Sequence, residues 1–159
     1  MKKALVAYFS CTGTTKRVAK TLAETAGADL YEIQPQKPYT NTDLNWMDSN
    51  SRCNTEMKNP ASRPEIKGEA EGMEDYDVIF LGFPIWWYVA PHIINTFLES
   101  YDFSGKTIVP FATSGGSGLG RTVDELRKSC FSSAKFDKGK VWNGNPAAAD
   151  LAAWAGKFM

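Results

Sequence analysis

Short apolar runs and helical patterns alternate along the chain. The first run, "KKALVAYFS", ends in a Gly/Thr cluster and predicts a strand buried on both faces. Residues 14–27 follow, with Val18, Leu22 and Ala26 at four-residue spacing and Gly27 as the stop, which predicts an amphipathic helix. Further strands are predicted at 29–35, 76–87, 106–113 and 138–144, and further helices at 91–103, 120–130 and 146–159.

This order is β-α-β-(long loop)-β-α-β-α-β-α. Strands that alternate with helices imply right-handed crossovers and a parallel sheet covered on both faces. The composition is 43% apolar and 13% aromatic over 159 residues, which is enough for one well-filled core. We expect a single α/β domain over residues 1–159.

Residues 36–66 interrupt the alternation and show no sustained period. Loops of this length in compact domains are usually functional or mobile. A surface elaboration and a cover over a ligand are equally weighted here, because Tyr39, Trp46 and Met47 are costly to expose. The acidic stretch from Glu65 to Asp77 favours a solvated helix face or linker over a docking patch.

Charge and cysteine content exclude several classes of protein. Lysine plus arginine (18) balance aspartate plus glutamate (18), so no global field attracts nucleic acid. Three cysteines without CxxC or ligand spacing indicate neither a disulfide framework nor a metal site, which favours the cytoplasm. The uncharged stretch Val78–Leu98 contains two prolines and is not interpreted as membrane-inserted. Nor is the N-terminus interpreted as a signal peptide, since its apolar stretch ends in a polar loop.

Ligands of open α/β sheets bind at the carboxyl ends of the strands, so the loops that follow strands hold the candidate chemistry. The first, "SCTGTT", leads into a helix whose free N–H groups and dipole suit an anion. It lacks the Gly-Lys-Ser/Thr ending of a triphosphate loop. A monophosphate held by neutral donors therefore fits better, and a helix cap alone explains one hydroxyl but not four.

The second and third loops complete the expected ligand. "FPIWWYVAP" places Trp86 and Trp87 where an aromatic face can stack on a flat ring, and both being core residues is disfavoured because neighbours in an extended segment point apart. "ATSGGSG" fails the dinucleotide fingerprint because Arg121 stands where glycine is required, but a glycine-rich turn can bring backbone polar groups to a ring edge. A monophosphate, a flat ring and a polar ring edge together describe flavin mononucleotide (FMN).

On these motifs the chain resembles the flavodoxin family over essentially its full length, and within it the short-chain flavodoxin-like proteins with a Gly-x-Pro-Ile-Trp-Trp loop. The resemblance implies a three-layer sandwich with a five-stranded parallel sheet in the order 2-1-3-4-5. It implies FMN contacts from three loops: Ser10, Cys11, Thr12, Gly13, Thr14 and Thr15; Pro84, Ile85, Trp86 and Trp87; and Thr113, Ser114, Gly115, Gly116 and Ser117.

Two details of the site are expected on the same grounds. Trp86 is the favoured stacking partner, and a carbonyl near Trp87 is expected close to flavin N5. The tyrosine that many flavodoxins place in the third loop is absent, so Tyr88 and Trp46 are the candidates to cover the outer face of the ring.

Three functions are compatible with this pattern. The favoured one is an electron carrier whose FMN cycles between oxidised, semiquinone and hydroquinone states and whose partners are a flavodoxin reductase-type donor and an acceptor. The alternative is an FMN-dependent NAD(P)H:quinone-type oxidoreductase with a small quinone-like acceptor, and a third is an FMN module without turnover. Balanced charge weakens the carrier, whereas one short domain without an evident nicotinamide site favours it.

No catalytic side chain is predicted, because the flavin itself carries out the redox step. His92 is expected to cap or pack rather than relay protons, and Cys11 to be a spacer rather than a thiolate activated by the helix start. Since the three loops contain no carboxylate, the second one-electron potential is expected to be less negative than in acidic flavodoxins.

Overall fold

The computed structural model describes residues 2–87, 89–114, 118–130 and 133–159. Its main sheet is parallel, with the order β2-β1-β5-β6-β7, and β8 also pairs with β6. This confirms the predicted order 2-1-3-4-5, with the fifth position shared by two short strands. The strands are β1 (Ala4–Tyr8), β2 (Asp29–Glu32), β5 (Val78–Pro84), β6 (Thr107–Thr113), β7 (Lys135–Phe136) and β8 (Lys140–Val141).

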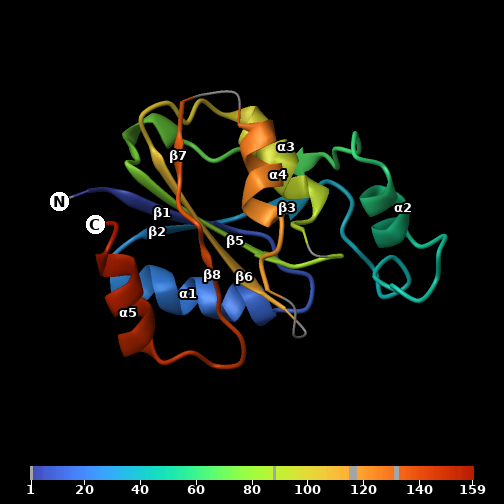
Figure 1. The fold of residues 1–159 in the computed structure, drawn as a ribbon, viewed down its shortest axis with the longest axis horizontal. Coiled ribbons are helices and arrows are strands. Elements are labelled where there is room, and N and C mark those ends of the chain that lie inside the picture. The colour runs from blue at the N-terminus through green and yellow to red at the C-terminus, as the bar shows by residue number, and fades with distance from the viewer. Residues whose placement is uncertain (1, 88, 115–117, 131–132) are drawn as a thin grey trace.

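Helices cover both faces of the sheet (Figure 1). On one face lie α1 (Thr14–Ala26) and α5 (Ala148–Gly156), and on the other α3 (His92–Ser100) and α4 (Thr122–Ser129). Successive strand residues alternate between the two cores: Val6 and Phe80 pack with α1 and α5, whereas Leu5 and Ile79 pack with α3. Among the described residues, no helix has the length and apolar content needed to cross a membrane.

The first helix matches its predicted bounds because its stop signal is unambiguous. Gly27 is left-handed, with φ 63°, and Ala28 N–H donates to the Ala23 carbonyl at 3.0 Å. The last helix begins at Ala148, two residues after the predicted start at Pro146.

The fifth strand was predicted at 138–144, and the structure corrects this to two segments, β7 and β8. Thr107 pairs with Lys135, and Phe111 pairs with Lys140. Between these two pairs the edge segment therefore contains one residue more than β6 does. The interruption lies opposite Pro110, which has no N–H to continue the ladder. Gly139 fits there because a Cβ at its position would lie 2.6 Å from the Pro110 carbonyl oxygen.

The second strand, predicted at 29–35, also divides. Only β2 joins the main sheet; β3 (Gln34–Pro35) pairs antiparallel with β4 (Ile66–Lys67) in a separate two-stranded sheet. Beside that sheet, Gln36 N–H donates to the Glu65 carbonyl at 2.8 Å. Residues 36–65 therefore form a closed excursion whose two ends are held together.

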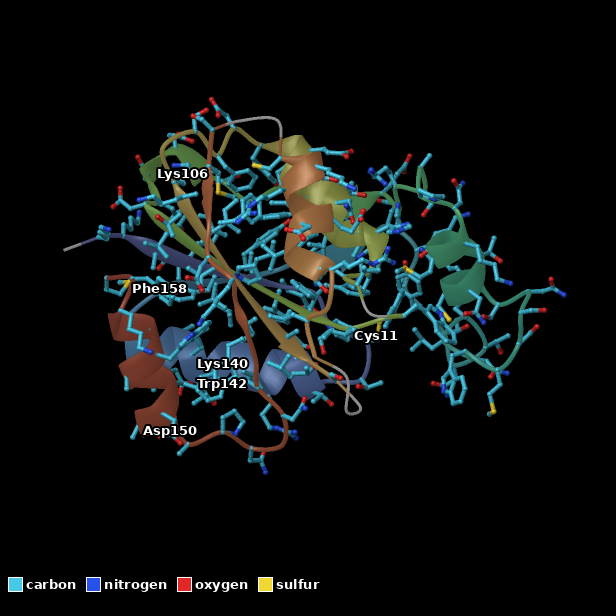
Figure 2. All side chains as sticks on the ribbon, viewed as in Figure 1. Cys11, Lys106, Lys140, Trp142, Asp150 and Phe158 are labelled. Atoms are coloured by element: carbon cyan, nitrogen blue, oxygen red, sulfur yellow. The ribbon has the colours of Figure 1, made fainter. Side chains whose placement is uncertain are left out.

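The excursion lies beyond the carboxyl ends of the sheet strands and contains α2 (Arg52–Lys58) (Figure 1). The acidic stretch that follows contains no α-helix among the described residues: it forms β4 and then the short 3-10 helix η1 (Met73–Asp75), as a linker would. Lys106, buried at the opposite end of the sheet from Cys11 (Figure 2), donates through Nζ to the Tyr76 carbonyl at 2.6 Å and stabilises that linker.

Candidate functional site

The first, second and third loops meet at one cavity of about 600 Å³ at the carboxyl ends of the strands. Eleven of the fifteen predicted site residues line it: Ser10, Cys11, Thr12, Thr14, Thr15, Pro84, Ile85, Trp86, Trp87, Thr113 and Ser114. Gly13 lies beside it as the N-cap of α1. Gly115, Gly116 and Ser117, and the outer-face candidate Tyr88, lie outside the described residues. Leu44, Trp46 and Cys53 complete the lining from the excursion.

The first loop is built to present neutral donors. Gly13 adopts φ 92°, a conformation that favours glycine, and its N–H donates to Ser10 Oγ at 3.1 Å. Thr14 then starts α1, whose first turn contains no acidic side chain. Free N–H groups at the start of this helix, with the hydroxyls of Thr12 and Thr14, form an uncharged site for an anion. Lys16 and Arg17 are exposed and do not line the cavity.

A buried hydroxyl pair joins the first loop to the third. Thr15 Oγ1 and Thr113 Oγ1 are 2.8 Å apart, and the two residues are 1% and 4% exposed. Ser114, the next residue, donates its backbone N–H to Asn143 Oδ1 at 2.8 Å. The third loop is therefore anchored on one side to α1 and on the other to the segment after β8.

The second loop turns sharply after β5. Trp86 N–H donates to the Val89 carbonyl at 2.8 Å, and Val89 N–H donates to the Trp86 carbonyl at 3.2 Å. Trp87 follows Trp86 with φ 53°, as the first central residue of a primed turn requires. The pair separates as predicted: Trp86 packs edge to face on Phe9 and Tyr39, whereas Trp87 is 52% exposed.

The excursion forms one wall of this cavity, which favours the cover over the surface elaboration. Cys53, at the start of α2, is 5% exposed and lines the cavity. Trp46 extends to the mouth, where its ring centroid lies 6.5 Å from that of Trp87. Leu44 and Cys53 carried no sequence signal, because neither lies beside a strand end and the excursion has no periodic pattern.

An ion-paired cluster supports that wall from behind. Arg52 Nε donates to Glu56 Oε2 at 2.9 Å, and its guanidinium carbon lies 3.8 Å from the centre of the Tyr39 ring. Tyr39 OH donates to Glu56 Oε1 at 2.5 Å, and burial together with this bond raises the pKa of Tyr39. None of these three residues lines the cavity, so their charges are satisfied outside it.

Cys11 lies at the end of the sheet that faces the excursion (Figure 2). Burial raises the pKa of its thiol to about 12, against a smaller lowering by Arg52. The thiol is therefore protonated at neutral pH, which supports the spacer interpretation over an activated thiolate.

His92 lies outside the cavity lining, at the start of α3. Its Nδ1 is 2.5 Å from Ser62 Oγ, and Ser62 Oγ donates to the Glu56 carbonyl at 2.7 Å. Burial, and secondarily Arg63, lower the pKa of His92. This contact joins the excursion to α3 and agrees with a packing role.

Comparison with known proteins defines the class. The flavodoxin family model matches residues 3–158, so the chain belongs to the flavodoxin family. No curated protein sequence matches it significantly.

Solved structures give two nearer relatives and one distant one. A Bacteroides eggerthii protein provisionally described as a flavoprotein is 45% identical, with 99% of this chain and 98% of that chain covered and a TM-score of 0.90. A similarly described Bacteroides uniformis protein is 46% identical, with 96% of this chain and 97% of that chain covered and a TM-score of 0.88. A Lactobacillus acidophilus flavoprotein, solved in complex with FMN, shares the fold at 19% identity, with 98% and 99% covered and a TM-score of 0.73.

The residues present fit the cofactor that family membership implies. FMN needs donors for a phosphate, a flat apolar slot and polar groups at a ring edge. The described lining supplies hydroxyls at the start of α1, indole rings after β5 and the polar residues Thr113 and Ser114. Apart from Cys11 and Cys53, none of the side chains that line the cavity from the described residues is ionisable. FMN is therefore supported as the cofactor, on the first two motifs and the described part of the third.

Proposed function

We propose that this protein is an FMN-dependent electron-transfer protein. The observation that carries the proposal is the shared cavity: a neutral anion site at the start of α1 and two tryptophans after β5 face the same space. The fold of the Lactobacillus acidophilus flavoprotein, solved with FMN, supports the same cofactor here. When bound, FMN supplies one- and two-electron chemistry.

The side chains of this protein then bind and orient rather than react. Hydroxyls and free N–H groups of the first loop would hold the phosphate, which sets the position of the ring. Trp86, held by Phe9 and Tyr39, would offer a fixed aromatic face. The lining, as far as the structure describes it, adds no carboxylate to oppose negative charge on a reduced ring, which supports the less negative second potential expected above.

The second candidate is a reductase that takes hydride from a nicotinamide cofactor and reduces a small quinone-like acceptor. One observation favours it: Leu44, Trp46 and Cys53 extend the cavity with an apolar wall that a flat acceptor could contact. For the carrier, the partners would be a flavodoxin reductase-type donor and an acceptor protein. Under either function, we place the protein in the cytoplasm because of its cysteine usage, and we propose no role in nucleic-acid binding or membrane insertion.

Stopped-flow mixing separates the candidates. FMN-loaded protein is mixed anaerobically with NADH or NADPH while flavin absorbance is followed, with and without a flavodoxin reductase. We expect rapid bleaching only with the reductase present, followed by reoxidation by an acceptor protein. Direct bleaching by a nicotinamide cofactor alone would favour the quinone reductase. Failure to bind FMN would refute both, and bound FMN that no physiological reductant reduces would favour a module without turnover.

A further inference from the structure

Trp87 is half exposed yet held in one orientation. Its indole Nε1–H donates to Asn54 Oδ1 at 2.8 Å, although 52% of the residue is accessible to solvent. An aromatic side chain at a cavity mouth would otherwise sample several rotamers, and ordering it on ligand binding costs affinity. The bond from α2 therefore removes that cost before a ligand arrives.

Asn54 is suited to this task because its amide is fully committed. The residue is 5% exposed, and its Nδ2 group donates to the Trp46 carbonyl at 2.9 Å and to the Asp48 carbonyl at 2.7 Å. Two carbonyl acceptors on one side and an indole donor on the other allow only one orientation of the amide. Asn54 thus links the excursion loop before α2 to the loop after β5.

The segment that follows α2 is fixed to α3, so the link has a rigid base. Arg63 Nε bonds Glu99 of α3 at 3.0 Å, and Ser62 contacts His92. The β3–β4 pairing holds the two ends of the excursion together.

We propose that Asn54 is a positioning residue of the cofactor site, which holds Trp87 at the cavity mouth in the orientation that contacts the ring end of FMN. The inference rests on the proposed function only in taking FMN as the ligand. Asn54 itself does not line the cavity and acts through Trp87.

The test compares Asn54→Leu with Asn59→Leu, an identical change at an exposed position directly after α2. Four variants are titrated with FMN and with riboflavin: these two, Trp87→Phe, and the double variant Asn54→Leu/Trp87→Phe. We expect Asn54→Leu to weaken both flavins equally, by about three- to tenfold, because, of its three hydrogen bonds, the one to Trp87 is the one that orders the ring contact. Asn59→Leu should bind as the wild type does.

The double variant shows whether Asn54 acts through Trp87, because a role of Asn54 in stability alone would not couple its effect on affinity to that of Trp87. In the double variant, loss of affinity should not exceed that of Trp87→Phe alone, because both changes remove the same contact. In the flavin-free protein, the Trp87 indole N–H resonance should shift and exchange faster with water in Asn54→Leu but not in Asn59→Leu.

Three results would overturn the inference. They are Asn54→Leu binding flavin like Asn59→Leu, additive effects in the double variant, and an indole N–H of Trp87 that exchanges freely in the wild type. The exchange rate of the Trp87 indole N–H in the wild type, with that resonance assigned by its loss in Trp87→Phe, tests the inference even if Asn54→Leu does not fold. A wild type that binds neither flavin would instead refute the proposed function, and this inference with it.

Discussion

The hydroxyl pair Thr15–Thr113 allows a sharp test of how the first and third loops are joined. In Thr15→Val the side chain keeps its shape but loses its oxygen, so the Thr113 hydroxyl, in a residue 4% exposed, loses its described partner. A buried hydroxyl without a partner costs about 1–3 kcal/mol. For a chain of this length that lowers Tm by about 2–12 °C. Thr113→Val should cost a similar amount, for the same reason.

The double variant Thr15→Val/Thr113→Val should recover most of this loss, because two apolar groups of the same shape replace both partners. We expect it to unfold within about 1 kcal/mol of the wild type, which gives a coupling energy of about 1–3 kcal/mol between the positions. The assay is urea unfolding of flavin-free protein, since bound FMN would add its own stabilisation. Thr21→Val, on the partly exposed side of α1, is the matched control and should change stability by less than about 0.5 kcal/mol.

Losses that simply add in the double variant would refute the buried-pair interpretation. The same variants also separate packing from ligand contact. If the double variant is stable but binds FMN weakly, the hydroxyls themselves contact the cofactor. If it binds FMN normally, their role is to join the two loops.

Three further predictions follow from other parts of the structure. Gly82→Ala should lower the free energy of unfolding in urea by about 1–3 kcal/mol, because its Cβ would lie 2.3 Å from Phe111 Cζ. Gly156→Ala, whose Cβ would enter open space, should not lower it. Thr12→Ala should weaken FMN far more than riboflavin in calorimetric titrations; equal weakening would mean that the first loop does not hold phosphate. Because burial lowers the pKa of His92 in the folded state, the free energy of unfolding should decrease as pH drops through about 6.5. Urea unfolding at several pH values should show a weaker pH dependence in His92→Gln, and an unchanged pH dependence in this variant would contradict the prediction.

The central strands and their loops were predictable because local signals agreed there. β1 and β5 are buried on both faces, so they appear as continuous apolar runs, and the loops that follow them contain the residues of the cavity. The family pattern added the 2-1-3-4-5 order, which periodicity alone does not specify. Residues from three distant segments could thus be assigned to one site.

The sheet edge was predicted less well, because tertiary pairing decides it. Nothing near Gly139 announces the break between β7 and β8; its cause is Pro110, on the neighbouring strand. The division of 29–35 likewise depends on β4, which lies more than thirty positions further along the chain. Short strands held by distant partners carry little signal of their own.

The excursion shows why the site could be only half assigned from sequence. Its inner side is neutral, with Leu44, Trp46 and Cys53 on the cavity, whereas Arg52 and Glu56 pair with each other behind it. A segment that faces a ligand on one side and satisfies its charges on the other has no single period, so its pattern indicates a loop. The pairing also balances the charges of Arg52 and Glu56 beside the cavity. For the proposed partners or acceptors, we therefore expect selectivity to depend on shape and aromatic contact at the mouth, where Trp46 and Trp87 are exposed, more than on electrostatic attraction.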